Sequence, residues 1–194
     1  MKNIILSSHG FQKNKELKKQ LLLLLLKPTK ELSAVIITTA SVEWKEKNKH
    51  AVAAREALEN MGFKKVDFLD VEFDNPEKLK DYDIIYINGG NPFYLLYHLK
   101  KSGADIVIKE LFKKGAVIVG VSGGGVVLGP NINIANYFDK KSNTVGLKDL
   151  SALGLISIVM YPHYSQEIEN EIKKFESKFD CKVKRLIDEQ SVVV

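Results

Sequence analysis

The chain has 194 residues, of which 45% are hydrophobic and 27% charged, and its formal net charge is +5. This length and balance predict one globular domain, residues 1–194, that buries a sizeable core. The positive charge comes from lysines scattered among glutamates, which argues against a nucleic-acid partner. No apolar run approaches the ~20 residues of a membrane span, and the first residues lack the pattern of a secretory signal. We therefore expect a soluble, cytoplasmic protein with no membrane partner.

Apolar, β-branched runs alternate with helical patterns along almost the entire chain. Strands are predicted at 2–7, 33–38, 65–69, 83–87, 156–160 and 183–187, from 117 to the turn at 120–124, and as a short start at 191–194. Helices are predicted at 14–26, 44–61, 76–79, 92–101, 104–114 and 166–179, the first of which carries the leucines at 21–26 on a buried amphipathic face. This alternation predicts an α/β fold: a doubly wound, mainly parallel sheet with helices on both faces.

The strand that starts at Val117 ends in the pattern Gly120-x-Ser122-x-Gly124. Flanking glycines leave room for a sharp turn from strand to helix, with the serine hydroxyl exposed at the top of the sheet. In such a nucleophile elbow the N–H of the next residue, Gly123, can stabilise an oxyanion. The pattern is also compatible with an ordinary tight turn, so other residues must decide between the two.

A serine hydroxyl needs a general base to become a nucleophile. His163 follows a predicted strand, at the same kind of location as Ser122, and is the expected base. His9 also follows a strand and is expected to line the pocket. His50 and His98 lie within predicted helices, and we interpret them as solvated or packing residues.

The turn 88–91, Asn-Gly-Gly-Asn, follows the strand 83–87. A backbone N–H of this turn can supply a second oxyanion donor. The alternatives are a phosphate-binding turn and a turn with no ligand. Because the segment has neither the Walker ending nor the G-x-G-x-x-G pattern, a nucleotide site is disfavoured.

Three segments together, 87–93, 120–124 and 162–164, resemble the landmarks of the dipeptidase E/cyanophycinase family of serine peptidases. They occur in the family's order, and the resemblance extends from the first strand to about residue 179. It implies a flavodoxin-like sheet similar to that of class I glutamine amidotransferases, with serine in place of their cysteine. It also implies Ser122 as nucleophile, His163 as general base, and the amides of Gly90 and Gly123 as the oxyanion hole. Known members cleave dipeptides with amino-terminal aspartate, or the polymer cyanophycin.

The sequence departs from the family pattern at the position of the acid that orients the base. Aspartyl dipeptidases carry an acidic residue about fifteen positions after the serine, where this chain has Tyr137. Asp139 is the nearest acid and Asn136 a polar neighbour, and either can fix the tautomer of His163. We predict Asp139 as the third catalytic residue. Gly123 stands where the family usually has alanine, which makes the elbow more flexible.

A second departure concerns the substrate. The segment after His163 is short, and no arginine lies between Arg55 and Arg185, so no guanidinium fork is available there for a substrate carboxylate. This argues against aspartate specificity. We expect Asn91 and His9 to contact the substrate. The chain also stops where the family usually continues into a terminal strand pair, so we expect a minimal or shortened member.

The single cysteine, Cys181, excludes an internal disulfide and a metal site of clustered cysteines, and we interpret it as structural. The predicted function is that of a serine peptidase acting on a dipeptide or another small, aspartyl-peptide-like substrate, with no metal and no cofactor. The alternative is a catalytically impaired relative that binds a small ligand or a partner. A small esterase ranks lower, because no His-Gly-Gly-Gly segment precedes the elbow. A homodimer is left open.

Overall fold

The computed structural model describes residues 3–194, whose main sheet has six strands in the order β3-β2-β4-β5-β1-β8. The strands are β1 (Ile4–Ser7), β2 (Ser33–Ile37), β3 (Lys65–Leu69), β4 (Ile84–Ile87), β5 (Val117–Val121) and β8 (Ser191–Val193). The first five run parallel, and β8 lies antiparallel to β1 at the edge. The predicted doubly wound, mainly parallel sheet is confirmed. Lys2, the predicted first residue of the first strand, lies outside the described residues.

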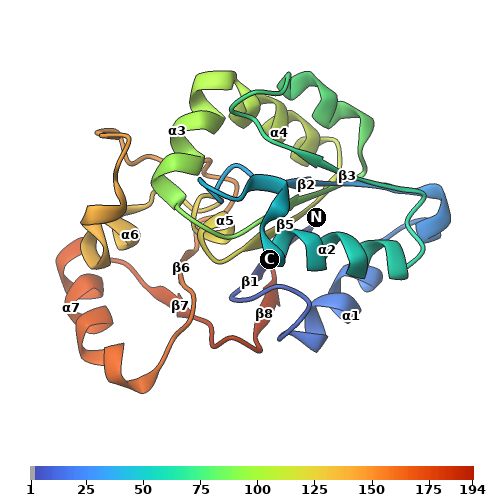
Figure 1. Cartoon of the computed structure of the whole chain (residues 1–194). Helices are drawn as coiled ribbons and strands as arrows, with labels where there is room; N and C mark the ends of the chain where they lie inside the picture. The colour runs from blue at the N-terminus through green and yellow to red at the C-terminus, as the bar shows by residue number, and fades with distance from the viewer. Residues whose placement is uncertain (1–2) are drawn as a thin grey trace.

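Helices cover both faces of this sheet (Figure 1). On one face are α1 (Lys15–Leu24) and α2 (Lys49–Asn60), and on the other are α3 (Pro92–Ser102), α4 (Ala104–Lys113) and the short α5 (Gly123–Val126). Strand β2 shows why its sequence is continuously apolar: Val35 and Ile37 pack in one core, and Ala34 and Ile36 in the other. All four side chains are fully buried, as expected for a strand covered on both faces.

A second, two-stranded parallel sheet pairs β6 (Val159–Tyr161) with β7 (Val183–Arg185) outside the main sheet. Beside it lie α6 (Asn133–Phe138) and α7 (Glu169–Phe179) (Figure 1). The strands predicted at 156–160 and 183–187 therefore exist, but they are shorter than predicted and do not extend the main sheet. The reason is that β8 occupies the position next to β1.

Two predicted helices, 44–61 and 166–179, begin with a 3₁₀ turn instead of an α-helical turn. The segment 44–61 begins with a 3₁₀ turn (Lys45–Lys47), and α2 starts after Asn48. The Asn48 side chain accepts hydrogen bonds from the N–H groups of His50 (2.9 Å) and Ala51 (3.4 Å), so it caps the helix. The other 3₁₀ turns are Thr29–Glu31, Pro76–Asp81, Lys140–Ser142 and, before α7, Gln166–Ile168.

The leucine run at 21–26 is only partly buried. Leu21 is fully buried against the main sheet, together with Leu17 one turn earlier, whereas Leu23 is 74% and Leu26 96% exposed. The period of α1 therefore decides which of its own leucines enter the core, and Leu26 follows the end of the helix at Leu24. Within residues 3–194, no helix combines the length and the apolar character needed to cross a bilayer.

We expect Leu21→Ala to lower the free energy of unfolding by about 2–5 kcal/mol, because it leaves a cavity between α1 and the sheet. Leu23→Ala is the matched control and should change stability by less than about 0.5 kcal/mol. Urea denaturation followed by circular dichroism measures both. Equal effects of the two substitutions would contradict the burial pattern described for α1.

Candidate active site

Ser122 lies on a sharp turn between β5 and α5. Its backbone has φ +49° and ψ −120°, a conformation that residues other than glycine rarely adopt. Three hydrogen bonds hold it there. The Ser122 N–H donates to the carbonyl of Ser7 on β1 (2.9 Å), and its carbonyl accepts from the N–H groups of Gly125 (2.9 Å) and Val126 (3.0 Å). The hydroxyl consequently projects at the carboxyl edge of the main sheet.

His163 brings an imidazole to this hydroxyl. Its Nε2 lies 2.9 Å from the Ser122 Oγ. The His163 backbone also has a positive φ, +54°, and its N–H donates to the Ser8 hydroxyl at 2.7 Å. The next residue, Tyr164, donates to the carbonyl of Leu186 at 3.0 Å. The backbone that carries the ring is thus hydrogen-bonded to the residue after β1 on one side and to the segment after β7 on the other.

The third member of the hydrogen-bonded chain is Asp188, which sequence reasoning missed. An Asp188 carboxylate oxygen lies 2.6 Å from His163 Nδ1. The pairing of β6 with β7 explains this contact, because Tyr161 lies opposite Arg185 in a parallel register. His163 and Asp188 follow those two residues closely, so both emerge at the same end of the small sheet. One available signal was that Asp188 directly follows the predicted strand 183–187.

Asp139, predicted to orient the base, makes no hydrogen bond to His163, and neither does Asn136; here the prediction is wrong. The Asp139 carboxylate accepts a hydrogen bond from the hydroxyl of Ser142. Tyr137, at the position of the family's acid, packs edge-to-face against Phe175 with the ring centroids 5.4 Å apart. The segment around 137–139 therefore belongs to the packing of α6 and α7, which a count of residues from the serine does not reveal.

Lys13 neutralises the side of Asp188 that faces away from the histidine. The Lys13 Nζ lies 2.8 Å from the second carboxylate oxygen, and the Asp188 side chain is 26% exposed. The hydrogen bond from Lys13, followed by that from His163, lowers the pKa of Asp188 to about 2. Asp188 is therefore ionised throughout the neutral range, and it can stabilise a protonated imidazole.

Two glycines, Gly90 and Gly123, present backbone N–H groups beside Ser122. Neither N–H has a hydrogen-bond acceptor among residues 3–194. Gly90 has φ +142°, and a Cβ there would collide with the carbonyl of Ala40, so no larger residue fits. A Cβ on Gly123 would likewise collide with the Gly90 carbonyl. Close packing of the two backbones leaves two unpaired donors, which is the chemistry that an oxyanion hole requires.

A cavity of about 210 Å³ opens onto Ser122 and His163. Its wall also contains His9, as predicted, together with Asn48, His50 and Asn88. His50 was expected to be solvated or packing, but the 3₁₀ turn before α2 and the cap at Asn48 place it at the cavity. The His9 ring lies edge-to-face to that of His50, with centroids 5.1 Å apart.

Asn91, predicted to contact the substrate, has a structural role instead. Its Oδ1 accepts from the N–H groups of Phe93 (2.9 Å) and Tyr94 (3.1 Å), which caps α3. Its Nδ2 donates to the carbonyl of Ser142 at 2.7 Å. Because both ends of the amide are occupied, the side chain has little capacity left for a ligand. His98, on the same helix, is buried, as expected for a packing residue.

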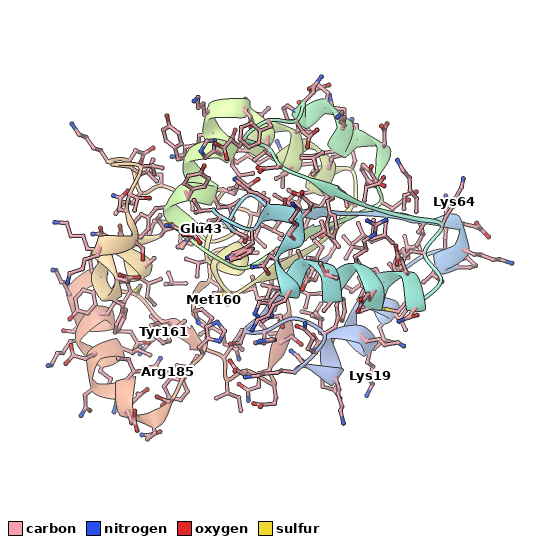
Figure 2. The ribbon with its side chains drawn as sticks, in the orientation of Figure 1. Lys19, Glu43, Lys64, Met160, Tyr161 and Arg185 are labelled. Atoms are coloured by element: carbon pink, nitrogen blue, oxygen red, sulfur yellow. The ribbon has the colours of Figure 1, made fainter. Side chains whose placement is uncertain are left out.

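Both arginines lie away from the cavity. Arg185 is on β7 beside Tyr161 (Figure 2), and its guanidinium pairs with Glu169 (2.9 Å) and Glu176 (2.8 Å). Arg55 pairs with Glu59 on the outer side of α2. The sequence-based inference that no guanidinium is available for a substrate carboxylate therefore agrees with the geometry.

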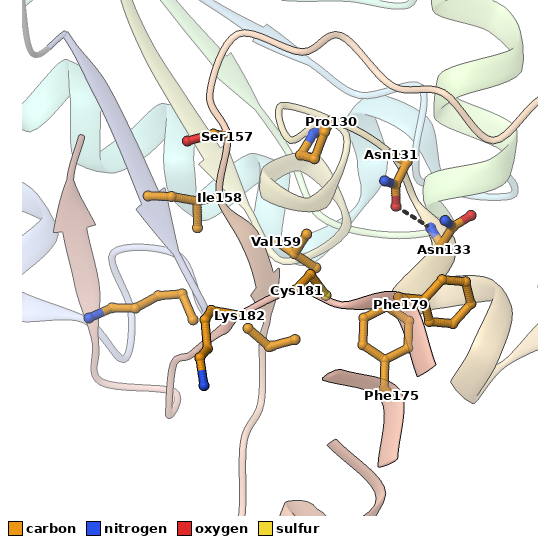
Figure 3. A pocket seen from close by; sticks show the side chains of 12 residues that line it. Pro130, Asn131, Asn133, Ser157, Ile158, Val159, Phe175, Phe179, Cys181 and Lys182 are labelled. Carbon is orange, nitrogen blue, oxygen red and sulfur yellow. Dashed lines mark hydrogen bonds between the residues drawn. The ribbon is translucent and has the colours of Figure 1, made fainter. Parts of the chain in front are cut away.

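A separate cavity of about 520 Å³ lies beside α7 and β7 (Figure 3). It is lined by apolar groups such as Phe175 and Val159, and by Cys181. Burial raises the pKa of the Cys181 thiol, so the group is a poor nucleophile at neutral pH. Within the described part of the chain, no three His, Cys, Asp or Glu side chains cluster to hold a metal ion.

Comparison with known proteins finds one family over nearly the whole chain: the sequence model of peptidase family S51 matches residues 4–194. The uncharacterized peptidase Lmo0363 of Listeria monocytogenes is 36% identical over 141 residues, or 71% of this chain and 67% of that protein. Peptidase E of Shewanella amazonensis is 30% identical over 111 residues, or 57% of this chain and 45% of that protein. The chain thus spans about two thirds of one curated relative and less than half of the other.

A solved structure shares the architecture. The crystal structure of a "Putative Peptidase E Protein" from Listeria monocytogenes EGD-e superimposes with a TM-score of 0.81 at 28% identity. The match covers 100% of this chain and 94% of that chain. A peptidase from an acI-B1 Actinobacterium, at 21% identity and a TM-score of 0.63, shares the fold.

The contact between Asp188 and His163 predicts that Asp188→Asn slows covalent labelling of Ser122 by an activated phosphonate by about 10²–10⁴-fold. The amide no longer stabilises the imidazolium and permits the wrong tautomer. Asp139→Asn is the matched control and should label at the wild-type rate. Mass spectrometry of the modified peptide measures both rates. A larger loss in the Asp139 variant would restore the sequence-based assignment.

Removal of the lysine charge should raise the pKa of Asp188. In Lys13→Met we expect a value above about 2, measured by NMR titration of the carboxyl carbon. The pKa of Asp188 in the folded protein lies below the ~3.9 of an unfolded chain. Its contribution to stability is therefore present above pH ~4 and is lost as the pH falls towards 2. An unchanged pKa in the variant would show that His163 alone depresses it.

Proposed function

This chain belongs to peptidase family S51, and from that premise we propose that it hydrolyses a small peptide through an acyl-enzyme formed on Ser122. The observation that carries the proposal is the continuous hydrogen-bonded chain from Ser122 through His163 to Asp188. Nucleophile, base and orienting acid are thereby in contact without any substrate. The adjacent unpaired N–H groups of Gly90 and Gly123 supply the remaining electrostatic requirement.

Acylation follows from these contacts. His163 Nε2 takes the hydroxyl proton as Ser122 Oγ forms a bond to the scissile carbonyl carbon, and the N–H groups of Gly90 and Gly123 hold the resulting oxyanion. Asp188 stabilises the imidazolium. When the carbon–nitrogen bond breaks, the imidazolium gives its proton to the leaving amine.

Deacylation repeats the sequence with water. His163 removes a proton from a water molecule, the hydroxide attacks the ester carbonyl, and the same two N–H groups stabilise the second oxyanion. The bond to Ser122 Oγ then breaks, and the imidazolium returns its proton to the serine. The carboxylic acid product leaves, and the starting protonation states are restored.

Two alternatives lose support. A binding-only relative was favoured by the missing acid at Tyr137, and Asp188 supplies an acid from another segment. An esterase of the α/β-hydrolase type has its catalytic residues in the order Ser, Asp, His along the chain, whereas the order here is Ser122, His163, Asp188.

Hydrolysis of a dipeptide panel by the wild-type protein and by Ser122→Ala tests the proposal. We expect the variant to lose roughly 10³-fold or more in kcat, because no other oxygen lies at the end of the chain. Product amino acids, quantified by chromatography, give the rates. Turnover that persists in folded Ser122→Ala would exclude the serine mechanism, and no turnover of any peptide by the folded wild-type protein would favour binding alone.

A further inference from the structure

Asn88 places an unsatisfied amide beside the nucleophile. It follows β4, only 2% of the residue is exposed, and its backbone N–H donates to the carbonyl of Ile37 at 3.1 Å. Its side-chain amide makes no hydrogen bond to any described residue, and Asn88 lines the cavity shared by Ser122 and His163. Its amide atoms are not among the buried atoms that lack a partner, so they remain accessible in the cavity, where their hydrogen-bonding capacity is unused. A bound ligand would satisfy it.

His50 presents a hydrogen-bond acceptor on the same wall. The Gln12 side chain donates through its Nε2 to the carbonyl of Lys49 (3.5 Å), so its Oε1 is the oxygen that faces His50 Nδ1 at 3.3 Å. An oxygen there requires Nδ1 to carry the proton. The other nitrogen, Nε2, is then an unprotonated acceptor with no partner among the described residues.

His50 adds no positive charge to the cavity at neutral pH. Burial is the main cause that lowers the pKa of His50, and the nearby His9, Lys49, Lys13 and His163 act in the same direction, so the ring is uncharged at neutral pH. No Lys, Arg, Asp or Glu side chain belongs to the part of the wall formed by the described residues. A carboxylate placed here would meet the unprotonated nitrogen of His50 and no lysine or arginine side chain of the described wall.

We propose, on the basis of the proposed function, that the substrate residue whose carbonyl group is attacked has a carboxamide side chain, as in asparaginyl peptides. The Asn88 amide donates to the carboxamide oxygen and accepts from its NH₂ group, and His50 Nε2 accepts the other N–H. Asn88 immediately precedes Gly89 and the oxyanion donor Gly90, which puts this contact on the acyl side of the bond. A cavity of about 210 Å³ is smaller than the ~300–1,000 Å³ pockets that bind drug-sized ligands, and its size suits one short side chain.

Asn-Leu and Asp-Leu dipeptides test the proposal, because their first residues have nearly the same shape and differ in charge and donors. Ser122→Ala binds without cleaving, so calorimetry with this variant near neutral pH measures recognition alone. We expect Asn-Leu to bind at least about ten-fold more tightly, since an unpaired polar contact is costly. The wild-type kcat/KM should show the same preference.

Variants assign the preference to its residues. Asn88→Leu in the Ser122→Ala background keeps the volume and removes both hydrogen bonds, so the ratio of the two affinities should fall to near one. His50→Leu should reduce the ratio in part. His98→Gln, a histidine outside the cavity, is the matched control and should keep the ratio. Circular dichroism confirms folding of each variant.

The outcomes separate this inference from the proposed function. Equal or tighter binding of Asp-Leu, binding of neither dipeptide, or an unchanged ratio in both folded Asn88→Leu and His50→Leu would overturn the carboxamide assignment. Preferred binding of Asn-Leu without turnover by the wild type would support the assignment and count against hydrolysis. Turnover with a preference for Asp-Leu would do the reverse.

Discussion

The end of β1 fixes all three members of the hydrogen-bonded chain Ser122–His163–Asp188. The Ser7 carbonyl accepts from the N–H of Ser122, the Ser8 hydroxyl accepts from the N–H of His163, and the Ser8 N–H donates to the carbonyl of Gln190, two residues beyond Asp188. Ser7, the last residue of β1, and Ser8, which follows it, therefore set the positions of groups that come from three distant segments. The strained backbones of Ser122 and His163 persist because this strand anchors both of them.

The sequence was most informative where a local pattern coincides with a strand end. Ser122 and His163 each follow an apolar run, so the rule that functional residues lie at the carboxyl ends of parallel strands located both. Asp188 obeys the same rule, yet its partner strand could not be identified, because the pairing of two three-residue strands depends on tertiary contacts. A distance counted along the chain gave Asp139, whose carboxylate serves a local turn. The strands of the main sheet could be predicted without knowledge of tertiary contacts, because strands buried on both faces have continuously apolar sequences.

Helix caps explain the other differences between expectation and structure. Asn48 and Asn91 both use their side-chain oxygens to start helices; Asn48 lines the cavity, and Asn91 directly follows Gly90 in its wall. Capping occupies the side-chain amide of Asn91, and the cap at Asn48 orients the first residues of α2 so that His50 reaches the cavity. An asparagine beside a predicted site can therefore shape that site through a helix cap, whereas Asn88 caps no helix and keeps its amide available in the cavity.

The antiparallel strand β8 has a consequence for the order in which the site assembles. It pairs with β1, so residues 5–7 meet residues 191–193, which lie at the opposite end of the described residues. Until that contact closes, the loop that holds Asp188 has no attachment to Ser8. The elbow on β5 and the small β6–β7 sheet that carries His163 and Asp188 can thus form separately before the end of β1 joins them. Joining them requires contacts between segments far apart in the sequence, so the complete arrangement of Ser122, His163 and Asp188 is expected to form late in folding.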